Sequence, residues 1–97
     1  MRTFNQIYSE LKHYGAFKAE PSTQSDAIKS MSCFINEMIE GDDLGEMTET
    51  SKRFLVMSYN FTAEQYILNW KTDKRTFKQL LQATYENLAS GVKHDCN

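Results

Sequence analysis

Few side chains in this 97-residue chain could do chemistry. His94 and Cys96 stand two positions apart near the C-terminus and could supply two metal ligands. A closed zinc site needs four, and the other candidates, His13 and Cys33, fall in separate predicted helices. No Lys, Arg or His precedes Cys33 closely enough to lower the pKa of its thiol, so a structural role for Cys33 is favoured over a reactive one.

Gly41 to Glu46 (GDDLGE) has the acidic residues of a calcium loop but not their order. The alternating carboxylates, central glycine and terminal Glu of an EF-hand are absent. No nucleophile with an activating base stands out either. The sequence therefore predicts a protein that is not an enzyme, with no catalytic residue, no metal and no cofactor.

The most unusual feature is the acidic stretch from Ile35 to Thr50, which contains no Lys or Arg. Its carboxylates are Glu37, Glu40, Asp42, Asp43, Glu46 and Glu49. Asp43 can cap the next helix with Glu46 in its first turn, where the helix dipole favours negative charge. Glu37 and Glu40 fall in the last turn of the preceding helix, where the dipole disfavours it.

Residues placed against local preference are where function is worth suspecting. Two interpretations of the acidic stretch stay open: a solvated corner of the molecule, or a binding surface for a basic partner. In the second case we expect that the fold does not need these charges. Reversal of Glu37, Glu40, Asp42 and Asp43 to Lys should then weaken partner binding and leave the helical signal and Tm nearly unchanged.

The elements that must position these groups are predicted to be helices, because the sole proline, Pro21, lies in a short polar stretch. Apolar residues recur at helical spacing along the chain. Helices are predicted to begin at Thr3, at Ser22 or Thr23, at Asp43, at Thr62, and at Thr72 or Asp73. Residues 53–61 fit either a buried helix or a short strand, and we favour a helix. The prediction is an all-α, compact single-domain bundle of about five helices over residues 1–97, with a frayed tail at 92–97.

Composition points to a cytoplasmic protein. The net charge is only −2, two cysteines far apart do not suggest disulfides, and the longest strongly apolar run, Phe54 to Met57, is too short to span a membrane. The N-terminus lacks the apolar stretch of a signal peptide. Pro21 is expected in an exposed loop, where a prolyl isomerase could meet it, although starting the second helix is its favoured role.

The carboxylates of IEGDDLGEMTE, the short chain, and its many aromatic and methionine residues resemble, as a class, small phage-encoded host-inhibitor proteins of the anti-CRISPR or anti-nuclease type. The resemblance implies a non-enzymatic inhibitor or modulator of a host DNA-processing or defence complex, acting in the host cytoplasm. Its acidic residues would bind a basic surface of a host protein by mimicking the dense charge of DNA.

Met47 to Leu88 is also similar in outline to the helix-turn-helix of phage-repressor-like regulators, with a short turn at Asn60 and Phe61 before a helix that ends in Trp70. This second resemblance implies a DNA-binding transcriptional regulator. The residues that it places near bases are Gln65 and Asn69, and those that it places on phosphates are Lys71, Lys74, Arg75 and Lys78. Asp73 stands where such regulators carry a glycine, and the following proline is missing.

Overall fold

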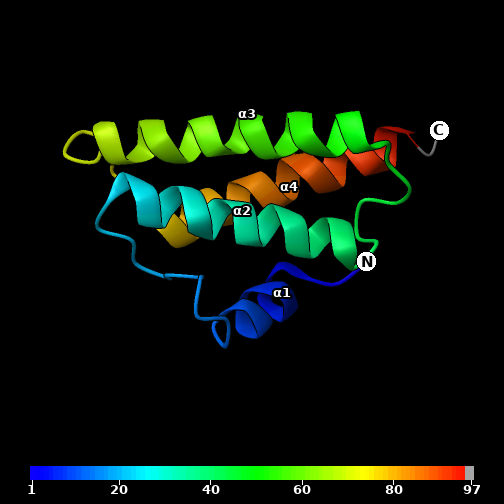
Figure 1. The fold of residues 1–97 in the computed structure, drawn as a ribbon, viewed down its shortest axis with the longest axis horizontal. Coiled ribbons are helices and arrows are strands. Elements are labelled where there is room, and N and C mark those ends of the chain that lie inside the picture. The colour runs from blue at the N-terminus through cyan, green and yellow to red at the C-terminus, as the bar shows by residue number, and fades with distance from the viewer. Residues whose placement is uncertain (96–97) are drawn as a thin grey trace.

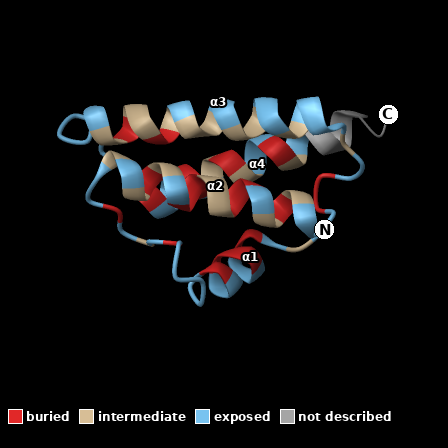
Figure 2. Cartoon of the chain, viewed as in Figure 1, coloured by how far each residue is buried: buried red, intermediate tan, exposed pale blue. Residues whose placement is uncertain are grey.

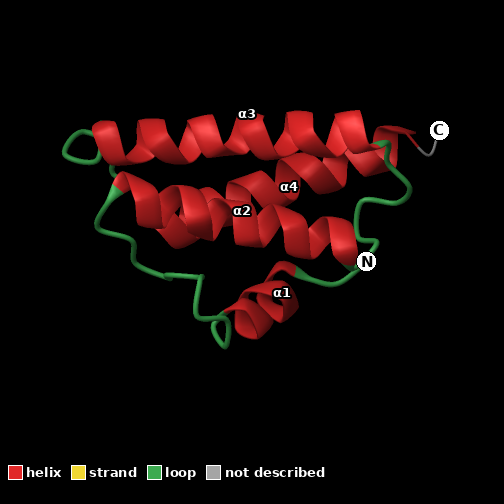
Figure 3. Ribbon diagram, in the orientation of Figure 1, coloured by secondary structure: helices red, strands yellow, loops and turns green. Residues whose placement is uncertain are grey.

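The computed structural model describes residues 1–95, with side chains through Ser90, and identifies four helices. They are α1 (Phe4–Leu11), α2 (Gln24–Glu40), α3 (Glu49–Leu68) and α4 (Phe77–Asp95). Figure 3 shows that loops join them, and no strand occurs among residues 1–95. The all-α class is confirmed, and so is the helical state of residues 53–61. No described helix is both long enough and apolar enough to cross a membrane.

Of the described helices, α2, α3 and α4 are long and α1 is short (Figure 1). The chain runs in opposite directions along α2 and α3, which pack side by side, and α4 lies behind α2 in this view. The short helix α1 packs against α2 on the side away from α3. The loop between α2 and α3 therefore lies at the same end of the molecule as the N-terminus.

The first two helix starts agree with the sequence. The Thr3 hydroxyl accepts the N–H of Gln6 while the Gln6 side chain accepts the N–H of Thr3, which is a complete capping box. Thr23 caps α2 by accepting the N–H of Asp26 at 3.1 Å. Local hydrogen bonding thus determines where α1 and α2 begin.

The prediction of five helices is wrong, because one continuous helix, α3, replaces the two predicted between residues 46 and 70. Asn60 and Phe61, read as a turn, lie inside it. The Thr62 hydroxyl does not cap a new helix but donates back to the carbonyl oxygen of Ser58 at 3.2 Å. Ser32 of α2 donates to the Asn60 side chain at 2.8 Å and so holds this part of α3 against α2. The turn required by a helix-turn-helix is therefore absent at this position.

The predicted starts of the last two helices also differ. Thr48, not Asp43, caps α3 by accepting the N–H of Ser51 at 3.2 Å. Thr76 and Gln79, not Thr72 or Asp73, form the reciprocal pair at the start of α4. The α4 backbone continues beyond Gly91 through residues 92–95, where the sequence indicates a frayed tail, and residues 96–97 lie outside the described part.

The buried core comes mainly from α1, α2 and α4, as Figure 2 shows. The largest fully buried side chains include Phe34, Ile7, Leu11, Met31 and Leu81. The 20-residue helix α3 contributes only Ala63 and Tyr66 to this buried set. Helix α3 therefore lies on the outside of the core and is only partly covered by it.

Asn60→Pro should distinguish a continuous α3 from a turn. Proline removes a helix hydrogen bond and clashes with the preceding turn, so we expect the free energy of unfolding to fall by about 3 kcal/mol or more. Urea unfolding followed by circular dichroism measures this loss. Asn60→Ala is the matched control, because it removes only the bond from Ser32; equal losses for the two variants would contradict a continuous helix.

Candidate functional site

The acidic stretch lies at the end of the molecule where α2 stops and α3 begins (Figure 1). Helix α2 ends at Glu40, Gly41 follows as its C-cap, and residues 42–48 connect to α3. The six carboxylates do not form one uniform surface, since some are exposed, Glu37 is half-buried and Asp43 is buried. They divide into two groups with different partners.

Arg2 holds the first group. Its Nε and one terminal nitrogen donate to Oδ2 of Asp43 at 3.1 and 2.6 Å, and its backbone N–H donates to Oδ1 at 2.8 Å. The other terminal nitrogen donates to Glu37 at 3.0 Å and also to Glu10. We call Arg2, Glu10, Glu37 and Asp43 the Arg2 cluster. Its hydrogen bonds, chiefly those to Asp43, raise the pKa of the Arg2 guanidinium above its usual value despite partial burial.

The Arg2 cluster is built into the fold. Asp43 is only 4% exposed, so its carboxylate depends on Arg2 for charge compensation. Tyr85 of α4 donates its hydroxyl to the backbone oxygen of Arg2 at 2.6 Å, and Tyr14 donates to Glu37 at 3.3 Å. A Cβ on Gly41 would clash with the Arg2 guanidinium. Helices α1, α2 and α4 and the α2–α3 loop therefore meet at this cluster.

The Arg2 cluster explains why Glu37 tolerates the last turn of α2. Its carboxylate faces a guanidinium, which outweighs the unfavourable end of the helix dipole. The contacts of Glu37 and Asp43 with Arg2 argue against the expectation that the fold does not need these two charges. Sequence reasoning missed Arg2 because it lies 41 positions before Asp43, and no local pattern connects them.

The second group, which we call the exposed acidic set, consists of Glu40, Asp42, Glu46 and Glu49, all classed as exposed. The only ion pair of this set among residues 1–90 joins Glu49 to Lys52 at 3.4 Å, and the Glu49 side chain is 79% exposed, so solvent screens it strongly. Asp42 has a φ of 58°, a left-handed conformation that Asp adopts more readily than most residues. This set can attract a cationic surface.

A shallow groove of about 440 Å³ between α2 and α3 borders the exposed acidic set. Its apolar lining comes from Ile39, Val56 and Met57. Its polar and charged lining residues are Asn36, Glu40, Glu49, Lys52 and Arg53. The groove therefore offers apolar contact area next to two of the exposed carboxylates.

The residues of the DNA-binding alternative are spread over α3, the following loop and α4. Asn69 caps the end of α3 and donates its side-chain amide to the carbonyl oxygen of Gln65 at 2.9 Å. Arg75 is engaged by Asp73, and the Lys78 ammonium lies 4.9 Å from the ring centre of Tyr8. The others in that set, Lys71 and Lys74, are exposed in the loop. Several of these groups thus already have partners within the chain.

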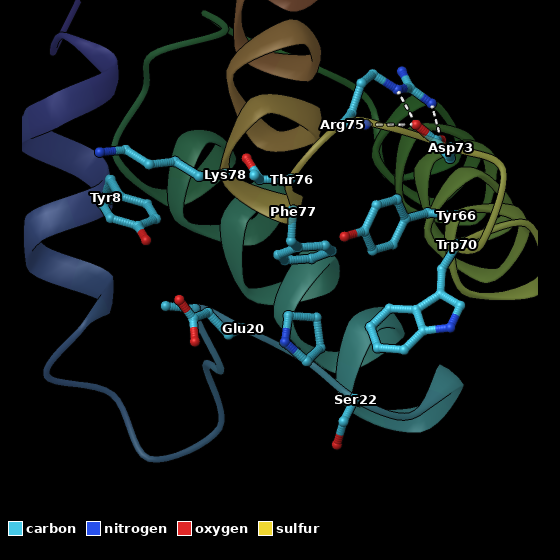
Figure 4. Close-up of a pocket in the computed structure, with 12 residues that line it drawn as sticks. Tyr8, Glu20, Ser22, Tyr66, Trp70, Asp73, Arg75, Thr76, Phe77 and Lys78 are labelled. Carbon is cyan, nitrogen blue, oxygen red and sulfur yellow. Dashed lines mark hydrogen bonds and ion pairs between the residues drawn. The ribbon is translucent and has the colours of Figure 1, made fainter.

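A larger open pocket, of about 670 Å³, lies between α1, the linker before α2, and the loop before α4 (Figure 4). The ring centroids of Tyr66 and Phe77 lie 5.7 Å apart in its wall. Asp73 and Arg75 form a two-point ion pair at its side. That pair, through the Arg75 hydrogen bonds above all, lowers the pKa of the Asp73 carboxyl to about 2. Pro21 also lines the pocket and is buried, so its expected place in an exposed loop is wrong.

Among the described side chains, the cysteine and histidine candidates are Cys33 and His13. Cys33 is half-buried, and burial, followed by the charge of Glu37, raises the pKa of its thiol. His13 lies in the turn after α1, and the side chains of His94 and Cys96 lie outside the described residues. No group of three potential metal-ligating residues occurs in the described part of the chain.

Comparisons with protein-family models, with curated proteins and with solved structures find no match to this chain.

Asp43→Asn tests whether the Arg2 cluster is structural. The change removes the main counter-charge of the Arg2 guanidinium. Breaking a buried ion pair by removing one partner typically costs about 3–5 kcal/mol. Because Arg2 is partly exposed, we expect the free energy of unfolding to fall by about 2–4 kcal/mol. Thermal and urea unfolding measure this change. The matched control, Glu40→Gln, removes an exposed charge and should change stability by less than about 0.5 kcal/mol. Equal stability of the two variants would contradict the structural role.

Proposed function

We propose that this protein is a non-enzymatic binding protein that inhibits or modulates a partner protein by contacting its basic surface. The observation that carries the proposal is the division of the carboxylates: Glu37 and Asp43 are paired with Arg2, while Glu40, Asp42, Glu46 and Glu49 face solvent. Like charges held together on a folded surface repel one another, and a cationic partner relieves that repulsion. The set thus favours association with basic surfaces.

The α2–α3 groove supports a protein as the partner. A protein interface combines charged contacts at its rim with apolar contacts at its centre. The exposed acidic set supplies the first, and Ile39, Val56 and Met57 in the groove supply the second. The partner surface that fits is therefore one with basic side chains next to a protruding apolar side chain.

In its most specific form, the proposal is that the partner belongs to a DNA-processing or host-defence complex. The basic surfaces of such complexes bind a dense row of phosphates, and the exposed acidic set would occupy part of that surface in place of DNA. The resemblance to small phage-encoded inhibitors supports this form. The four exposed carboxylates are its site residues, and Glu37 and Asp43 serve the fold.

Charge reversal tests the proposed surface. Glu40→Lys with Glu46→Lys should remove a stoichiometric partner captured from a bacterial lysate and identified by mass spectrometry. Glu20→Lys with Glu86→Lys, two exposed residues outside the set, changes the net charge equally and should retain the partner. Loss of the partner in both variants, or in neither, would count against the proposal. Exposed charges act largely on association rate, so binding is measured at two salt concentrations.

Duplex DNA separates the proposal from the regulator alternative. We expect no discrete mobility shift at low salt, because the chain carries a net charge of −2 and the predicted turn at Asn60 and Phe61 lies inside α3. Displacement of DNA from the captured partner is the expected companion result. A shifted band that disappears in Lys74→Ala with Arg75→Ala would instead favour the regulator, since phosphate contacts dominate such binding.

A further inference from the structure

Helix α3 presents a row of large apolar side chains to solvent. Phe54, Met57, Phe61 and Leu68 are 70%, 71%, 62% and 59% exposed, respectively. Their spacings of three, four and seven positions place them on one face of the helix. We call these four residues the α3 stripe. The proposed function does not use the stripe as a unit.

The other side of α3 packs against the core of the same chain. Ala63 and Tyr66 are buried there, and Leu55, Val56, Tyr59 and Ile67 pack partly buried against the core. Helix α3 is therefore apolar on two sides, although only one of them contacts the rest of the chain. A helix that is apolar all round is normally covered all round, and an exposed apolar patch normally marks an interaction site.

Two charged residues on the outer side of α3 indicate what covers the stripe. Arg53 directly precedes Phe54, and Glu64 lies between Phe61 and Leu68 at helical spacing. Neither forms an ion pair within residues 1–90. One cation near one end of the stripe and one anion near the other make the face complementary to itself when it is turned end to end.

We propose that the α3 stripe is the interface of a homodimer in which α3 packs antiparallel against α3 of a second copy. With Met57 opposite Phe61 of the second copy, the two-fold axis crosses the helix pair on the stripe side, at the level of residue 59 along α3. This register brings Arg53 within reach of Glu64 of the second copy, and the symmetry repeats the pair. A parallel arrangement lacks this pair, because it would leave Arg53 about 16 Å along the helix axis from Glu64 of the second copy.

The dimer does not depend on the proposed function. The two share Met57, so in the dimer Ile39 and Val56 are the groove residues left for the partner. The stripe from Phe54 to Leu68 spans about 21 Å of helix at 1.5 Å per residue. Glu49 lies about 15 Å along the helix from the two-fold axis on the same scale. The two exposed acidic sets of the dimer would therefore lie at opposite ends of the helix pair, outside its centre.

The oligomeric state of the full chain tests this inference. Sedimentation equilibrium should give twice the monomer mass of 11.3 kDa, and Phe61→Glu should yield a folded monomer, since Phe61 is exposed within one copy. Arg53→Glu alone and Glu64→Arg alone should each raise the dimer dissociation constant about tenfold or more, because each places like charges together. The two changes combined should restore dissociation to within about threefold of the parent.

Lys74→Glu is the control, because it reverses an exposed charge outside α3 and should leave the dimer unchanged. Circular dichroism checks that each variant is folded. A parent chain that stays monomeric at about 100 μM overturns the inference, whether or not an unrelated protein binds the stripe. So does a dimer that survives Phe61→Glu, or a double variant that fails to recover, because each contradicts the antiparallel pairing.

Discussion

The ion pair between Arg2 and the buried Asp43 carboxylate is the contact on which this arrangement of helices depends. A carboxylate in that position is costly unless a cation and hydrogen bonds compensate it, and Arg2 supplies three donors. The same guanidinium reaches Glu37 of α2 and Glu10 of α1, while Tyr85 of α4 binds the backbone of Arg2. One residue near the N-terminus therefore ties together α1, α2, α4 and the α2–α3 loop.

This cluster also determines the charge of the surface beside it. Because Glu37 and Asp43 form ion pairs with Arg2, the carboxylates that face solvent are the smaller exposed acidic set, from Glu40 to Glu49. The loop geometry that buries Asp43 turns its neighbour Asp42 into a left-handed conformation at the surface. Carboxylates with a structural role and carboxylates with the proposed binding role therefore alternate along the acidic stretch, and it is their burial that tells them apart.

Helix α3 connects the two proposed surfaces. Its N-terminal residue Glu49 belongs to the exposed acidic set, and its middle and end carry the apolar stripe. Because α1, α2 and α4 supply most of the core among themselves, α3 adds only Ala63 and Tyr66 to the buried residues. A long helix attached through one side is free to offer the other side to a second protein chain.

The sequence by itself determined the helical class and the capped starts of α1 and α2, because helical periodicity and capping act within a few residues. It misplaced the starts of α3 and α4, since several threonines and aspartates offered equivalent caps and only tertiary contacts select among them. It also split α3 at Asn60, where a bond from Ser32 on α2 favours continuity. The tertiary structure alone decided which carboxylates stay exposed, because Arg2 meets Asp43 only after the chain has folded.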